Sequence, residues 1–220
     1  MNLEIRNLTL FNDQEDLIKD FSYSFAPGFV YFVFGQIGLG KSLLLESIAD
    51  LYSRYQGKII KDPKARISFL FQKNMLIPWL TVQENLALID QIQNSDWVQS
   101  LQDELKISNL LNKKAVDLSG GELQKINFYR ALAIEPNYIL ADEPFNSLDF
   151  KQKTELENLI LRYVKQRQAT LIWVSHDLIE INKFSDFVLC FSKSEKRFLK
   201  TLAKDEVNYQ TLSDYIVNEK

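Results

Sequence analysis

The chain has 220 residues, of which 46% are hydrophobic, so it is long enough to bury the core of one or two compact units. Its formal net charge of −3 gives no basic surface of the kind that binds nucleic acid, so we expect no nucleic-acid partner. Every apolar run is far shorter than the roughly 20 residues of a membrane-spanning helix. The segment 1–7 lacks the basic-then-apolar pattern of a signal peptide, so we expect a cytoplasmic protein. The single cysteine, Cys190, lies in an apolar run, which favours a buried thiol over a reactive one.

Strand-like and helix-like segments follow one another along most of the chain. In chain order we expect strands at 3–11, 18–25 and 29–34, a helix at 43–48, strands at 57–61 and 67–71, a helix at 121–133, a strand at 138–141, a helix at 150–167, a strand at 170–174, a helix at 177–184 and a strand at 187–191. The segment 81–114 has helical spacing of Leu and Ile and is predicted to be a helical insertion. The tail after Lys193 is charged and weakly patterned, with a short helix at 211–218. Short apolar strands that alternate with helices predict an α/β fold with a parallel sheet covered on both faces.

The most informative motif is a phosphate-binding pattern, G-x-x-x-x-G-K-[ST], between an apolar strand and a helix. It comprises Gly35, Gln36, Ile37, Gly38, Leu39, Gly40, Lys41 and Ser42. The glycines allow backbone N–H groups to surround a polyphosphate, and the following helix adds its N-terminal partial charge. In this pattern Lys41 reaches the β- and γ-phosphates, and the Ser42 hydroxyl holds Mg²⁺. A chance glycine-rich turn is the alternative, but the strand before, the helix after and the Lys-Ser register favour nucleoside triphosphate binding.

A second motif is the pair of carboxylates, Asp142 and Glu143, that ends the apolar strand at 138–141. At a strand end beside the phosphate loop, Asp142 can hold Mg²⁺ opposite Ser42. Glu143 can then polarise the water that attacks the γ-phosphate. The alternative is an acidic strand end that only starts a turn at Pro144.

A third motif opens the helix at 121–133 with Ser119, Gly120, Gly121 and Glu122. A serine and two glycines at a helix start present a hydroxyl and free N–H groups, which together form a second anion site. Ser119 with Glu122 three residues later also fits a capping box, so this motif alone would indicate only a helix cap.

Together the three motifs make the chain resemble the ATP-binding subunit of an ABC transporter over essentially its full length. The resemblance implies a P-loop NTPase fold with a mostly parallel core, an N-terminal antiparallel β part and an inserted helical subdomain. It implies one domain over 1–220, with the core at 1–80 and 115–220 and the helical subdomain at 81–114.

Four further positions match the family in order. Gln72 resembles the loop glutamine that senses Mg²⁺ and the membrane partner, and Asp149 resembles the loop residue that links two nucleotide sites. His176, the only histidine, resembles the residue that contacts the γ-phosphate, although a lone histidine after a strand is usually a polar strand end. Phe11 resembles the aromatic residue that stacks on adenine, although ordinary packing is the alternative.

The family's organisation implies a homodimer or pseudo-dimer, in which the Ser119–Glu122 motif of one chain closes over ATP and Mg²⁺ held by the other. It also implies separate membrane-spanning permease subunits that attach the chain to the inner face of the cell membrane. For an importer it implies a solute-binding protein as well. The run Ile77-Pro78-Trp79-Leu80-Thr81-Val82 is similar to ATPases of importers for nitrate, sulfonates, taurine and pyrimidine precursors. Two other functions stay open: a soluble ABC ATPase in assembly or envelope scaffolding, and a nucleotide-binding module that has lost turnover.

The sequence departs from the family pattern at several positions. Leu43 stands where a threonine is usual and contributes only its backbone N–H to the nucleotide site, and Ile37 and Leu39 stand where serines are common. The signature motif has Glu122 in place of glutamine, and Lys125 stands where arginine is common. None of these changes removes a catalytic group, so they bear on the rate of turnover rather than on its presence.

Overall fold

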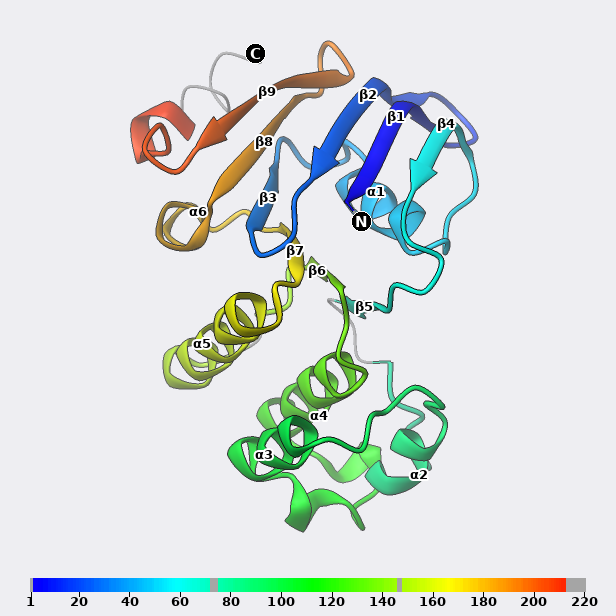
Figure 1. The fold of residues 1–220 in the computed structure, drawn as a ribbon, viewed down its shortest axis with the longest axis vertical. Coiled ribbons are helices and arrows are strands. Elements are labelled where there is room, and N and C mark those ends of the chain that lie inside the picture. Colours follow the sequence, from blue (N-terminus) through cyan, green and yellow to red (C-terminus); the bar gives the residue numbers. More distant parts are fainter. Residues whose placement is uncertain (1, 72–74, 146–147, 213–220) are drawn as a thin grey trace.

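In the computed structural model, which describes residues 2–71, 75–145 and 148–212, the chain forms one mixed sheet flanked by helices (Figure 1). The strands are β1 (Leu3–Phe11), β2 (Asp16–Phe25), β3 (Val30–Phe34), β4 (Tyr55–Ile60), β5 (Ile67–Leu70), β6 (Tyr138–Asp142), β7 (Thr170–Val174), β8 (Phe187–Ser192) and β9 (Arg197–Ala203). The helices are α1 (Lys41–Ile48), α2 (Val82–Ala87), α3 (Asp96–Leu105), α4 (Gly120–Ala133), α5 (Phe150–Arg167) and α6 (Leu178–Phe184). Among the described residues the sheet order is β4-β1-β2-β9-β8-β3-β7-β6-β5.

The parallel core of the sheet contains β8, β3, β7, β6 and β5. All five residues of β3 are buried, and successive side chains enter two different hydrophobic clusters. Phe32 joins one cluster, whereas Tyr31 and Val33 join the other. This alternation is what a strand covered on both faces requires, so the prediction of a doubly covered parallel sheet is confirmed.

The N-terminal part of the sheet is antiparallel, as the family resemblance implied. β1 pairs with β2 on one side and with β4 on the other, both in antiparallel register. The side chains of α1 pack with these strands in one cluster, and those of α3, α4, α5 and α6 contribute to the other. Each cluster therefore covers one face of the parallel strands, and the phosphate loop lies where β3 passes into α1.

The tail after Lys193 is more ordered than the sequence indicated. Residues Arg197–Ala203 form β9, which pairs antiparallel with β8 and touches β2 through the Lys19–Arg197 pair. β9 therefore joins the antiparallel part of the sheet to the parallel core. The weak pattern has a physical reason, because most β9 side chains are only half-buried or exposed. Most of the helix expected at 211–218 lies outside the described residues.

The segment 81–114 is helical, as predicted, and it lies at the end of the molecule away from β9 (Figure 1). A capping box between Thr81 and Glu84 begins α2, and the Ser95 hydroxyl caps α3. Trp97 on α3 packs against Tyr163 on α5, with ring centroids 5.3 Å apart. No helix in the described ranges is long and apolar enough to cross a membrane. Cys190 is buried on β8, where desolvation raises the pKa of its thiol to about 12, as expected for an unreactive core cysteine.

Candidate nucleotide-binding site

The phosphate loop is shaped by glycines at two positions with left-handed backbone. Gly38 has φ 82° and Gly40 has φ 93°, a region that residues with a side chain adopt at a cost. A Cβ on Gly40 would also lie 3.0 Å from Leu17 Cδ1. Gly40 is the N-cap of α1 and gives that helix no side-chain cap. The first N–H groups of α1 therefore remain available for an anion.

Lys41 folds back over the loop that precedes it. Its Nζ donates to the carbonyl oxygens of Gly35 at 2.7 Å and Gln36 at 2.8 Å, and the side chain is buried. Burial lowers the pKa of Lys41 to about 8, although Glu143 and Asp142 act in the opposite direction. The ammonium group is therefore held in the site by neutral carbonyl acceptors, which a polyphosphate would replace with negatively charged ones.

Asp142, at the end of β6, faces Ser42, at the start of α1, across the site. The two side chains are hydrogen-bonded, and burial raises the pKa of Asp142 while this bond opposes the rise. Among the described residues no group of three His, Cys, Asp or Glu side chains is placed to hold a metal alone. The hydroxyl and carboxylate are hard oxygen donors that suit Mg²⁺, an ion that typically takes its remaining ligands from water and substrate phosphate.

Glu143 and His176 are brought together from the ends of two neighbouring strands, β6 and β7. His176 Nε2 lies 3.1 Å from Glu143 Oε1, and the Glu143 N–H donates to Val174 O at 3.0 Å. Burial, followed by the charge of Lys41, lowers the pKa of His176, whereas Glu143 and Asp142 act in the opposite direction. The lowered pKa favours the neutral imidazole. Glu143 has φ 46°, a strained backbone for a residue with a side chain, of the kind that concentrates at functional sites.

These groups surround one cavity of about 350 Å³. The predicted site residues that line it are Ile37, Gly38, Gly40, Lys41, Ser42, Leu43, Asp142, Glu143 and His176. Asn12, Leu17 and Val174, which sequence reasoning did not single out as site residues, complete the wall. Phe11 precedes Asn12 but is not itself a lining residue, so adenine stacking on Phe11 stays a prediction. Gln72 lies outside the described residues.

Two apolar positions of the loop have different surroundings. Leu39 is 1% exposed and belongs to the hydrophobic cluster under the loop, where it packs against Gly35. Ile37 is 78% exposed. Lys193, which follows β8, donates from Nζ to Ile37 O at 2.9 Å. Leu39 therefore anchors the loop to the core, and Lys193 is a loop contact that no local sequence signal could reveal.

The Ser119–Glu122 motif lies outside this cavity. Ser119 caps α4 in a full capping box, in which its hydroxyl accepts from the Glu122 N–H and the Glu122 carboxylate accepts from the Ser119 N–H. A hydrogen bond from Lys113, with those from Ser119, lowers the pKa of Glu122 to about 2. This geometry is compatible both with a simple helix cap and with an anion site, because the cap leaves the Gly120 and Gly121 N–H groups at the helix start. Asp149 caps α5 by accepting from the Gln152 N–H at 2.9 Å.

Comparisons with known proteins agree with this geometry. Residues 18–146 match the sequence profile of the ABC transporter family. An aliphatic sulfonates import ATP-binding protein of Bacillus cereus is 30% identical, over 84% of this chain and 78% of that protein. A second such protein, of Pseudomonas syringae pv. tomato, is 33% identical over 79% of this chain and 75% of that protein. A solved ATP-binding subunit of an ABC transporter is 20% identical and superimposes with a TM-score of 0.85, covering 100% of this chain and 99% of that one.

Proposed function

The chain belongs to the ABC transporter family as an ATP-binding subunit with ATPase activity, and we propose that it powers a solute importer through separate membrane-spanning chains. The observation that carries the proposal is the cavity that joins the phosphate loop to Asp142, Glu143 and His176. The resemblance to sulfonate import proteins supports the import direction. The proposal includes a head-to-tail dimer, peripheral attachment to the inner face of the membrane, and the single domain with the 81–114 helical subdomain.

The residues of the cavity can each perform one part of ATP hydrolysis. The N–H groups of the loop and of α1 bind the phosphates, and Lys41 moves from its carbonyl acceptors to the β- and γ-phosphate oxygens. Ser42 and Asp142 would hold Mg²⁺, which when bound neutralises charge on the β- and γ-phosphates. Gln72 is assigned to the same ion by resemblance only.

Glu143 and His176 act at the γ-phosphate end of the cavity. The Glu143 carboxylate accepts a proton from the attacking water. The water oxygen bonds to the γ-phosphorus while the bond from phosphorus to the β–γ bridging oxygen breaks, and ADP is the leaving group. His176 Nε2–H, which donates to Glu143 when no nucleotide is present, then donates to a γ-phosphate oxygen.

The signature motif supports the dimer part of the proposal. Ser119, Gly120 and Gly121 present a helix start outside their own chain's cavity, where a second chain's ATP could reach it. Asp149, at the start of α5, is assigned to communication between the two sites. Phe11 is assigned to the adenine, next to the lining residue Asn12.

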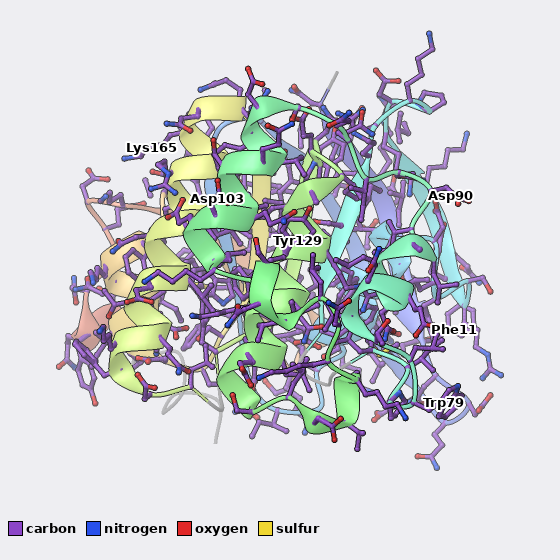
Figure 2. All side chains as sticks on the ribbon, turned by 90° about the horizontal axis from the view of Figure 1, so that it is seen from below. Phe11, Trp79, Asp90, Asp103, Tyr129 and Lys165 are labelled. Carbon is purple, nitrogen blue, oxygen red and sulfur yellow. The ribbon has the colours of Figure 1, made fainter. Side chains whose placement is uncertain are left out.

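A surface feature supports the link to membrane partners. Trp79, labelled at the edge of the molecule in Figure 2, is 72% exposed. Val116 is 67% exposed and adjoins it, because the Val116 N–H donates to Pro78 O at 3.0 Å. A rigid aromatic patch of this kind suits a docking surface.

One experiment separates transport from a soluble role. The chain carrying Glu143→Gln is purified from membranes, with a tag, in the presence of Mg-ATP, beside the unmodified chain. We expect both to copurify with a chain that has several spans of about 20 apolar residues, and only Glu143→Gln to lack ATP turnover. If the chain instead stays in the soluble fraction and no membrane-spanning chain copurifies with it, an assembly or scaffolding ATPase is favoured. Normal ATP turnover by Glu143→Gln would show that Glu143 is not the general base.

A further inference from the structure

The turn that carries His176 is held by a lysine on a neighbouring helix. Lys153 of α5 places its Nζ 2.8 Å from Asp177 Oδ2 and 2.5 Å from Glu180 Oε1. Glu157 Oε1 lies 3.9 Å from the same ammonium group. One cation therefore faces three carboxylates, two of which belong to the segment that begins directly after His176.

The contacts continue to the residue before His176. The Ser175 hydroxyl donates to Glu180 Oε2 at 2.5 Å and accepts from the Asp177 N–H at 3.0 Å. Asp177 Oδ1 accepts from the Ile179 N–H at 2.9 Å and so caps α6. The two residues that flank His176 are thus both fixed through one network, whereas the ring itself meets Glu143.

Most of the network is shielded from water, although the Asp177 side chain is 38% exposed. Ser175 is 5% exposed and Glu180 6%, and Glu157 is also buried. Burial disfavours the charge on Lys153, but its hydrogen bonds to Asp177 and Glu180 raise its pKa. Loss of the ammonium group would leave the buried carboxylates of Glu157 and Glu180 without this nearby positive charge, so the turn would have to rearrange.

The same lysine is connected to the loop that precedes α5. The Lys153 N–H donates to Asp149 O at 2.9 Å, in the first turn of the helix that Asp149 caps. Asp149 is the residue assigned to communication between two nucleotide sites. A displacement of the start of α5 would therefore move Lys153 and, through it, the His176 turn.

We propose that Lys153 is a positioning residue for ATP hydrolysis, which holds His176 at the γ-phosphate by binding Asp177 and Glu180 and ties this turn to Asp149. The inference rests on the proposed role of His176. It predicts that Lys153 affects the rate of the chemical step and has little effect on ATP binding, because Lys153 does not line the nucleotide cavity.

The test measures kcat and KM for ATP in Lys153→Met, Lys153→Arg, His176→Ala and the double variant Lys153→Met/His176→Ala. Asp177→Asn is the second probe, because asparagine also caps helices and so keeps α6 while removing the charge that Lys153 binds. Lys165→Met is the matched control on α5, since Lys165 is exposed at the other end of the helix (Figure 2). Each variant is first compared with the unmodified chain by thermal unfolding and by ATP binding.

We expect Lys153→Met and Asp177→Asn to lower kcat by about tenfold to a hundredfold with KM nearly unchanged, since small displacements of a catalytic group cost on this order. Lys153→Arg should recover most of the rate, and Lys165→Met should have none of the effect. In the His176→Ala background Lys153→Met should add almost nothing, as for residues that act as a unit.

Three results would overturn the inference. Normal kcat in both Lys153→Met and Asp177→Asn would show that the network does not position His176. Multiplicative losses in the double variant would mean that Lys153 acts only through stability or another group. Full activity of His176→Ala would show that His176 does not act in hydrolysis. That result would contradict the proposed function of the site and not only the role of the Lys153 network.

Discussion

The two apolar residues of the phosphate loop should respond very differently to truncation. Leu39 is 1% exposed within a hydrophobic cluster, and a Cβ on Gly35 would lie 2.8 Å from Leu39 Cδ2. Leu39→Ala should therefore cost about 2–5 kcal/mol of unfolding free energy, the range for a buried leucine that leaves a cavity. For a chain of this size that corresponds to a fall in Tm of about 5–15 °C. Ile37→Ala removes a side chain that is 78% exposed and should cost no more than about 0.5 kcal/mol.

The assay is urea unfolding of both variants and the unmodified chain, without nucleotide and at matched protein concentration. Leu39→Ala should shift the midpoint with an unchanged slope, and it should also weaken ATP binding because the loop loses its anchor. Ile37→Ala serves as the control in the same loop. Equal stability of the two variants would mean that Leu39 does not hold the loop to the core.

Two further predictions concern the nucleotide site. Since burial lowers the pKa of Lys41 to about 8 and ATP favours its charged form, ATP affinity should fall by up to about tenfold per pH unit above pH 8, with proton uptake on binding. Calorimetric titration in buffers of different ionisation enthalpy measures this, and constant affinity up to about pH 9.5 would contradict it. Gly120→Ala should leave stability unchanged or raise it by up to about 1 kcal/mol, since no described atom beyond its chain neighbours and the backbone of its own helix lies within 4 Å of the added Cβ. It should nevertheless lower ATPase turnover, because the methyl group stands where the partner's ATP would meet the helix start, and normal turnover would argue against that contact.

Much of the fold could be predicted because the decisive signals are local. The apolar strand pattern and the helical spacing of apolar residues predicted β1, α5 and β7 with the bounds that the structure has. The chemistry of the phosphate loop and of Asp142 and Glu143 follows from their places at strand ends, which a parallel sheet brings to one edge. Their meeting with His176 follows in the same way from the end of β7.

The parts that were missed depend on contacts between distant segments. The half-buried side chains of β9 have no pattern of their own, and only pairing with β8 makes the segment a strand. Leu39 and Ile37 look alike in the sequence, yet the path of the loop buries one and exposes the other. Lys193 contacts Ile37, and Lys153 contacts Asp177, although each pair is separated in the sequence by more residues than a short motif covers.

Closure of two copies of this chain over ATP can be measured by size-exclusion chromatography with light scattering on Glu143→Gln. The variant is run with Mg-ATP, with Mg-ADP and without nucleotide, after ATP binding has been measured. We expect a monomer without nucleotide or with Mg-ADP and a dimer with Mg-ATP, and we expect Gly120→Ala in the same background to weaken that dimer. A monomer that has bound Mg-ATP at concentrations well above its dissociation constant would contradict closure by this chain alone.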